Sequence, residues 1–555
     1  MRRPKSLLFA IPLTLALALT ACSAESDSSG GDSSSESSSS SEGGESAGTA
    51  GGTFSVSSSE PEAFAPTSNC YSSDCSQIIN AVFTGLLKVD PETSEPIYTG
   101  AESFESEDGQ NWTIKLKDGF TFHNGEPVDA ESYVRAWNYA ANGANATQLG
   151  FFFSKVEGYD DLQGENPKAE EMSGLTVVDD LTFEVALSEP FSQFPLTMSY
   201  TPAAAPMAQE CMDDIKACNE QPIGNGPYQF AEKWNHNQSI TLEKYADYSD
   251  EETAGLADGM EFKIYADLST AFRDFQGGNL DIVIPDPSQI PQARAQYADS
   301  LLEVDSGSFA YFGFPFYEPD FQKPEIRQAL SLAIDRQSII DNVLQGRFIP
   351  ATDVISPFVP GSRDDACEFC VYDPDQAKEL WDGAGGVEGN EISIWFNNDG
   401  GHEQWVKAMA QGWQQDLGVD FTFKSQPFTP YLKALGTQSE VDGPYRLGWL
   451  PDYPSPQNYL DPLYGEGSSN YGKWGEGDSA ADQQEFLDLV NEGDAAATVE
   501  EGIPSYQAAA DVVLDNMVVI PLWFGQTFYV MSENVENVKY SPTDQLLLDE
   551  ISVTS

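Results

Sequence analysis

Residues 23–52 consist almost entirely of Ser, Gly, Glu, Asp and Ala, and this composition divides the chain before any other feature is considered. A segment with so few apolar residues cannot bury enough surface to offset the entropy lost on folding. We therefore predict a flexible tether over residues 22–52. The chain has 555 residues. About 500 of them follow the tether, which is enough for two or three domains with real cores.

Residues 1–21 have the pattern of an export signal. Arg2, Arg3 and Lys5 precede an apolar run over 7–19 that is too short to span a membrane and ends in small residues. The junction Leu-Thr-Ala-Cys, which ends at Cys22, resembles the lipobox of bacterial lipoproteins. This resemblance implies cleavage before Cys22, acylation of that cysteine, and an extracytoplasmic protein anchored to the outer face of the cell membrane. The alternative is an ordinary signal peptide followed by a free cysteine.

The charge balance limits the possible partners. The chain has 89 acidic and 27 basic residues and a formal charge of −62. This excludes a nucleic-acid partner, because phosphates require a basic surface. The acidic residues are scattered, so the plain interpretation is a solvated surface rather than a metal store. We hypothesise an adaptation to salty surroundings, where ions screen the self-repulsion.

The cysteines that follow Cys22 fall into three near pairs. These pairs are Cys70–Cys75, Cys211–Cys218 and Cys367–Cys370. Outside the membrane the redox state favours disulfides, and proximity in sequence favours these pairings among the fifteen that six cysteines allow. Cys-x-x-Cys at 367–370 also occurs in zinc and redox sites, but a structural zinc requires four ligands and no second motif supplies them.

The sequence contains no recognisable catalytic constellation. The three histidines are far apart, and no Gly-x-Ser-x-Gly nucleophile elbow occurs. The stretch from Gly467 to Trp474 matches a P-loop except that Trp474 replaces the required Ser or Thr. We therefore expect no enzyme, no metal and no cofactor. A glycosidase, which needs only two carboxylates, is the enzyme class that so acidic a chain leaves open.

Apolar periodicity and turn signals predict a mixture of helices and strands. Residues 111–128 and 175–190 each suggest two strands joined by a tight turn. Helices are expected after Asp129, over 269–276, in two pieces over 323–346 with Asp335 as a cap, after Asp373, and before the strand near 420. The mixture is typical of an α/β or mixed α+β protein.

The stretch from Trp449 to Tyr464 combines aromatic residues, prolines and two aspartates. The residues before it predict the end of a strand, and its prolines argue that the stretch itself forms neither strand nor helix. We interpret it as a rigid loop that presents Asp452, with Asp461 as a residue that caps its own turn.

Five segments in order resemble one family. They are WTIKLKDGFTFHNGEPVDAESYVRAWNY, PIGNGPYQF, EIRQALSLAIDRQSII, YDPDQAKELWDGAG and GWLPDYPSPQNYLDPL. Together they closely resemble the solute-binding proteins of ATP-binding-cassette (ABC) importers, in the oligopeptide/dipeptide-binding family. The resemblance runs from about residue 54 to the C-terminus.

The resemblance implies a two-lobed periplasmic-binding-protein type II fold with an extra inserted domain. Lobe I comprises 53–90, 220–305 and 522–555, the inserted domain 91–219, and lobe II 306–521. The chain crosses between the lobes near 304–315 and 518–525, and the lobes close about this hinge. The plain alternative for these two apolar runs is that they are core strands, and the two interpretations are compatible.

By the same resemblance, Asp452 pairs with the α-amino group of a peptide ligand. Backbone groups of Gly448 and Leu450 bind the extended peptide as an added strand, and Trp449 and Tyr453 line the wall. A buried carboxylate is unfavourable unless a cation meets it. The alternative role for Asp452 is to cap its own turn.

Ser72 and Ser73, beside the Cys70–Cys75 loop, are expected at the border of the cleft. The family also implies the partners, which are a short peptide and the permease subunits of an ABC importer, and we expect a monomer. An oligosaccharide-binding protein of the same fold and a peptide-sensing lipoprotein without transport are the alternatives. The identity and length of the peptide are beyond the sequence.

Overall fold

The computed structural model describes residues 51–91, 93–250, 253–398, 401–437, 440–465, 469–476, 479–541, 543 and 545–554. The predictions for the export signal, for Cys22 and for the tether up to residue 50 lie outside these residues. Within the described ranges, no helix is both long and apolar enough to cross a membrane.

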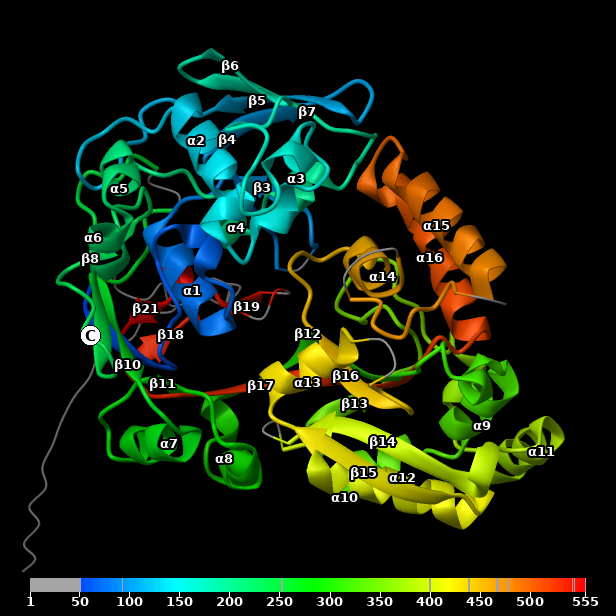
Figure 1. Cartoon of the computed structure of the whole chain (residues 1–555). Helices are drawn as coiled ribbons and strands as arrows, with labels where there is room; N and C mark the ends of the chain where they lie inside the picture. The colour runs from blue at the N-terminus through cyan, green and yellow to red at the C-terminus, as the bar shows by residue number, and fades with distance from the viewer. Residues whose placement is uncertain are drawn as a thin grey trace, which may run out of the picture. The chain divides into compact units, whose positions relative to one another are not determined.

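A mixed sheet of eleven strands is the largest element of the described chain (Figure 1). In spatial order its strands are β15 (Asp420–Gln426), β14 (Glu391–Asn397), β16 (Tyr445–Trp449), β12 (Leu301–Gly313), β17 (Val519–Met531), β11 (Ile282–Val283), β1 (Thr53–Ser58), β10 (Gly259–Ile264), β9 (Ser239–Lys244) and β8 (Tyr228–Phe230), with β13 (Phe348–Pro350) paired to β17. Parallel and antiparallel pairs both occur: β1 and β10 are parallel, whereas β12 and β17 are antiparallel.

The long strands β12 and β17 connect two hydrophobic clusters. They run side by side from Leu301 opposite Val530 to Gly313 opposite Val519 (Figure 1). Near its start, β12 contacts the cluster that contains Phe54, whereas Phe309 and the residues after it belong to the cluster that contains Phe396. The two expected crossings, 304–315 and 518–525, therefore fall largely on paired strands. The lobe boundaries themselves stay a prediction.

A second, four-stranded antiparallel sheet lies within residues 101–186. Its order is β4 (Ala101–Glu105), β5 (Asn111–Leu116), β7 (Thr182–Ala186) and β6 (Leu175–Asp179). The predicted hairpin over 175–190 is confirmed as β6 and β7. The predicted hairpin over 111–128 is wrong in its second half. Both edges of β5 are already paired, with β4 and with β7, so residues 120–128 have no edge to join and form turns with a single bridge, Thr121 to Pro127.

Short two-stranded pairs complete the strands of the described ranges. They are β2 (Leu87–Val89) with β3 (Pro96–Tyr98), β18 (Val535–Glu536) with β21 (Ser552–Val553), and β19 (Tyr540–Ser541) with β20 (Gln545–Leu546).

The expected helices form where cap residues and apolar spacing coincide. The helices are α1 (Ser73–Val82), α2 (Ala130–Ala141), α3 (Phe194–Thr197), α4 (Thr201–Ala204), α5 (Gln209–Asp213), α6 (Ile215–Glu220), α7 (Leu268–Gln276), α8 (Ile290–Gln296), α9 (Pro324–Leu332), α10 (Arg336–Asn342), α11 (Pro374–Ala384), α12 (Glu403–Leu417), α13 (Phe428–Leu435), α14 (Pro456–Tyr464), α15 (Ala480–Asp494) and α16 (Val499–Asp515). Asp129, Asp335 and Asp373 cap α2, α10 and α11 as predicted. Helix α12 contacts β15 and α10, and α10 also contacts β13 (Figure 1).

The proline-rich segment after β16 does contain a helix, so the prediction that it forms none is wrong. Pro456 occupies the first position of α14, where the missing N–H would have no helical partner in any case. Ser455 caps this helix, and its side chain accepts a hydrogen bond from Gln457 N at 3.2 Å. Asp461 lies inside α14 rather than at a turn, and its carboxylate accepts from Gln457 Nε2 at 3.3 Å. The interpretation of Asp461 as a turn cap is therefore also wrong.

The structure contains the three predicted disulfides: Cys70–Cys75, Cys211–Cys218 and Cys367–Cys370. Each closes a short loop, so each is expected to hold a local turn rather than to add much global stability. The described residues contain no group of His, Cys, Asp and Glu side chains arranged to hold a metal ion.

Candidate ligand-binding site

The end of β16 and the loop after it are fixed by one amide side chain. Asn458, in the first turns of α14, accepts hydrogen bonds through Oδ1 from Trp449 Nε1 at 3.2 Å and from Asp452 N at 3.0 Å. Asn458 is itself 2% exposed. The helix that the sequence did not predict therefore positions Trp449 and Asp452 relative to each other.

Asp452 is a partly buried carboxylate without a compensating cation. Among the described residues, no Lys, Arg or His forms an ion pair with it, and no backbone N–H donates to its side chain. Burial raises its pKa to about 7, although the Asn458 amide acts in the opposite direction. The carboxylate is therefore poised to accept a cation, because ion pairing would relieve this penalty.

Next to this loop lies a cavity of about 630 Å³, which we call the arginine cavity. It is walled by aromatic side chains and contains two arginines. Its lining includes Phe309, Arg347, Phe348, His402, Trp405, Phe428, Arg446, Gly448, Trp449, Leu450 and Trp523. An aromatic cavity with a few convergent polar groups is typical of a ligand site.

Among the described residues, neither arginine of this cavity forms an ion pair with a carboxylate, although Asp286 also lines the cavity and acts on the charge of Arg347. Arg446 donates from Nη1 to Asn397 Oδ1 at 3.2 Å, but its buried Nε has no hydrogen-bond partner among the described residues. Burial lowers the pKa of Arg446 to about 10, so the side chain stays charged at neutral pH. Burial also lowers the pKa of Arg347, whose Nε donates to Leu344 O at 3.2 Å. Arg446, on which no carboxylate of the described residues acts, is therefore the better placed of the two to bind an anionic ligand group.

One edge of β16 is open beside Gly448. Strand β16 pairs along its whole length with β12, where Gly448 lies opposite Ala310. Its pairing with β14 is limited to Tyr445 opposite Trp395. Gly448 is exposed, and a side chain there would come within 3.1 Å of Phe309 O. Beyond Tyr445, this edge pairs with no strand of the described residues, which is what addition of an extended chain requires.

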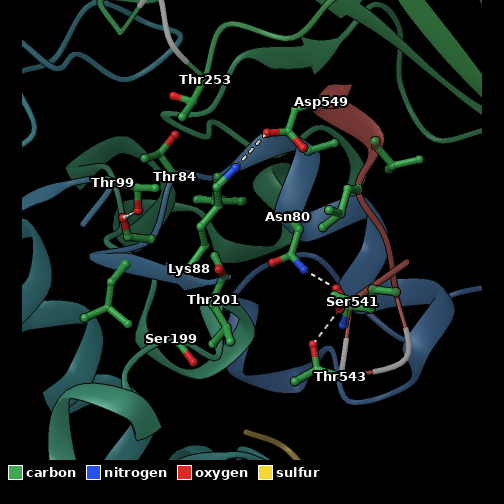
Figure 2. A pocket seen from close by; sticks show the side chains of 18 of the residues that line it. Asn80, Thr84, Lys88, Thr99, Ser199, Thr201, Thr253, Ser541, Thr543 and Asp549 are labelled. Atoms are coloured by element: carbon green, nitrogen blue, oxygen red, sulfur yellow. Dashed lines mark hydrogen bonds and ion pairs between the residues drawn. The ribbon is translucent and has the colours of Figure 1, made fainter. Parts of the chain in front are cut away.

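Asp452 borders two further cavities, and neither includes Trp449 or Gly448. The first, which we call the hydroxyl pocket, measures about 130 Å³ and is shown in Figure 2. Hydroxyl and amide groups line it, and Lys88 pairs with Asp549 at 3.2 Å at one end (Figure 2). The second, which we call the phenylalanine pocket, measures about 110 Å³ and is lined in part by Phe151, Phe152, Phe191 and Tyr453.

The predicted site residues are thus divided among neighbouring cavities. Gly448, Trp449 and Leu450 line the arginine cavity, Asp452 lies between the hydroxyl and phenylalanine pockets, and Tyr453 lines the phenylalanine pocket. Tyr453 is buried and donates to Gln457 Oε1 at 2.5 Å.

Ser72 and Ser73 have different positions. Ser72 caps α1 by accepting from Cys75 N at 3.3 Å, and its hydroxyl donates to Glu62. Ser73 lines a cavity of about 290 Å³ that also includes Arg347. Because Arg347 lines the arginine cavity as well, this side of α1 adjoins that cavity.

The amino-acid sequence did not predict several residues of the site. Arg446 lies three positions before Trp449, so its charge within an apolar strand was a usable signal. Arg347, Tyr200 and Asn458 gave no such signal, because only the folded chain brings them to the site. The Tyr200 hydroxyl meets Ser76 Oγ at 3.1 Å, and burial together with the Asp452 charge raises the pKa of Tyr200.

The mixed sheet with its long paired strands β12 and β17 has the type II periplasmic-binding-protein fold. Residues 95–471 match the model of the bacterial extracellular solute-binding proteins, family 5 Middle. The chain belongs to this family, whose members bind solutes and are not enzymes.

Individual relatives support the same assignment. The oligopeptide-binding protein OppA of Bacillus subtilis is 26% identical over 83% of this chain and 85% of its own length. The dipeptide-binding protein DppE of the same organism is 26% identical over 84% of this chain and 85% of its own length. The solved structure of the ABC-transporter substrate-binding protein CtaP from Listeria monocytogenes matches with a TM-score of 0.76 and 20% identity, covering 91% of this chain and all of CtaP.

Proposed function

We propose that this protein captures short peptides with a free α-amino group and delivers them to the permease of an ABC importer. The observation that carries the proposal is Asp452, a carboxylate with a raised pKa and no described cation beside it. A peptide amine would supply that cation. The peptide-binding names of the two Bacillus subtilis relatives support the same ligand class.

The arginine cavity offers a binding site for the carboxylate end of the peptide. A short peptide also carries a carboxylate, and Arg347 and Arg446 offer guanidinium groups to it beside the open edge of β16. Backbone groups of Gly448 and Leu450 would then bond the chain between its two ends. This arrangement favours a zwitterionic extended ligand over a neutral one.

We further propose that residues 1–21 are removed and that an acylated Cys22 anchors the protein to the outer face of the membrane. The tether and the lipobox-like junction support this. Lobe I, with the ranges 53–90, 220–305 and 522–555, and lobe II, with the range 306–521, would close about β12 and β17.

An oligosaccharide is the second candidate ligand, and the aromatic wall of the arginine cavity favours it. Trp405, Trp449 and Trp523 all line that cavity, and sugars stack on such rings. A neutral sugar would leave Asp452 without a cation, which is why we place the peptide first.

Calorimetric titration of the processed domain tests the proposal. Short peptides are titrated first, then their N-acetylated forms, then oligosaccharides, against the wild type and Asp452→Asn. We expect peptide binding that is lost on acetylation and weakened at least about tenfold by Asp452→Asn. Binding of oligosaccharides with no response to peptides would instead assign the protein to the sugar alternative.

A further inference from the structure

The phenylalanine pocket is bordered by Asp452 and shares no lining residue with the arginine cavity. Its aromatic wall comes from a short segment, residues 150–153, and from the chain before and within α3. Phe151, Phe152, Phe191 and Phe194 all line it, and Asp452 borders it from the loop after β16.

We propose that this pocket receives the side chain of the first residue of the ligand and selects aromatic or other large apolar side chains there. The inference rests on the proposed function, because it takes the α-amino group of the ligand to be held by Asp452. The first side chain is attached one atom from that amine, so a cavity that Asp452 borders is within its reach. The phenylalanine pocket and the hydroxyl pocket are both bordered by Asp452.

The aromatic rings of the phenylalanine pocket are held in place by contacts with one another, but they remain partly exposed to solvent. Phe152 stacks on Tyr200 with ring centroids 5.2 Å apart and planes 14° apart. Phe151 packs against Phe152 at 4.8 Å. The Phe151 side chain is nevertheless 51% exposed. An apolar ligand group placed here would remove this ring from water, which is favourable in proportion to the area covered.

The charged groups that line this pocket already interact with one another, so a charged first side chain would have to compete for them. Lys155, its basic group, already pairs with Glu189 at 2.6 Å and with Asp494 at 3.2 Å, and lies 4.8 Å from the Phe191 ring centroid. Asp461 also lines the pocket; burial raises the pKa of this carboxyl, and Lys155 lowers it against the effect of burial. A basic side chain would compete with Lys155 for Asp461, and an acidic one would compete with Glu189, Asp494 and Asp461 for Lys155.

The hydroxyl pocket is less suited than the phenylalanine pocket to a large apolar side chain. Apolar residues such as Phe83, Leu87 and Leu548 line it as well, but they share its wall with several hydrogen-bonded polar groups. Thr84 Oγ1 and Tyr248 OH are 2.8 Å apart, and the Asn80 amide donates to Gln545. Figure 2 shows Thr84 and Asn80 facing the same space as the Lys88–Asp549 pair. An apolar group there would separate these polar atoms from water without replacing their hydrogen bonds.

Calorimetry with tripeptides that differ only at the first residue tests this inference. The peptides are Phe-Ala-Ala, Leu-Ala-Ala, Ala-Ala-Ala, Lys-Ala-Ala and Glu-Ala-Ala, each also in N-acetylated form. We expect Phe-Ala-Ala to bind about tenfold or more tightly than Ala-Ala-Ala, and the Lys and Glu peptides to bind no better than Ala-Ala-Ala.

Two variants localise the effect. Phe151→Ser alters an exposed side chain, so the fold should persist, and melting curves check this. The variant should lose most of the Phe-over-Ala preference while keeping the affinity for Ala-Ala-Ala. Ser199→Ala, on the wall of the hydroxyl pocket, should leave the preference unchanged.

The outcomes distinguish a failure of this inference from a failure of the proposed function. Amine-dependent binding of all five peptides with equal affinity overturns the inference and leaves the proposed function standing. A preference that survives Phe151→Ser, or that Ser199→Ala removes, places the first side chain elsewhere and also overturns it. Absence of binding by any free-amine peptide overturns the proposed function and this inference together.

Discussion

Asp452 is the side chain whose charge we expect to contribute most to ligand binding. Its backbone is held through Asn458, and its carboxylate lies among neutral groups such as the Tyr200 phenol. The same burial that raises its pKa makes a cationic ligand favourable. At the scale of the residue, burial of Asp452 therefore lowers the stability of the ligand-free protein and at the same time favours the binding of a cationic ligand.

Ligand affinity should depend on pH through this group. The pKa of Asp452 is about 7 without ligand, and a peptide α-amino group has a pKa of about 7.7–8.0. Affinity should be greatest between these values and weaker by about tenfold or more at pH 5, because the carboxyl is then protonated. Titration from pH 5 to 9 measures this. Asp452→Asn should abolish this loss of affinity at low pH, and a loss that persists in the variant would assign it to another titratable group.

The ligand-free protein should gain stability when this charge is removed. A raised pKa means that the folded state binds the proton more tightly than the unfolded state does. The free-energy cost of burying the Asp452 charge is therefore absent below about pH 4 and complete above about pH 7. Because the side chain keeps some contact with solvent, we expect Asp452→Asn to unfold with a free energy about 1–3 kcal/mol higher at pH 8 and little changed at pH 4.

Denaturant unfolding at the two pH values measures this difference. Asp118→Asn, at an exposed position, is the matched control and should show neither effect. Equal stabilities of wild type and Asp452→Asn at pH 8 would contradict the buried-charge account.

At the scale of elements, Arg336 joins three segments without an acidic partner in the described chain. Its guanidinium donates from Nε to Pro521 O at 2.8 Å, from Nη1 to Cys370 O at 3.0 Å, and from Nη2 to Ser331 Oγ at 2.8 Å. These bonds link the end of α9, the Cys367–Cys370 turn and β17. The side chain is 3% exposed, so neutral oxygens, mostly backbone carbonyls, balance its charge.

Arg336→Met should therefore destabilise the protein strongly. It keeps most of the side-chain length but leaves several buried carbonyls without donors, which we expect to lower the free energy of unfolding by about 3 kcal/mol or more. Gln337→Met, on the exposed side of the same helix, should change it by less than about 0.5 kcal/mol. Chemical denaturation of both variants measures the contrast. Similar stabilities would mean that water replaces the lost donors.

At the scale of the whole molecule, the net charge of −62 dominates. So much like charge repels itself in the compact state, and dissolved ions screen that repulsion. The ion pairs of the described residues lie mostly at the surface, where each contributes little.

The melting temperature should accordingly rise with salt. Between about 0.05 and 1 M NaCl we expect an increase of roughly 5 °C or more, because the screening length falls from above to well below the spacing of surface charges. Scanning calorimetry measures the shift, and sucrose serves as the uncharged control. A melting temperature that is independent of salt would refute the proposed adaptation to salty surroundings.

The elements that the sequence predicted correctly are those with local causes. Asp129 caps α2 three residues away, Asp335 caps α10, and the three disulfides join cysteines no more than seven positions apart. The segment after β16 was the exception. Its helix depends on Pro456 at the first position and on Ser455, whose hydroxyl also donates to Gln193 Oε1, 262 residues away.

By itself, the sequence determined the export signal pattern, the acidic surface, most helices and strands, and the likeness that led to Asp452, because these depend on composition or on neighbouring residues. Only the tertiary structure decided that Arg347 and Arg446 share one cavity and that Phe151 lies beside Asp452. These residues are far apart in the chain. Their meeting depends on strand pairing and on helix α14, and no local pattern encodes either.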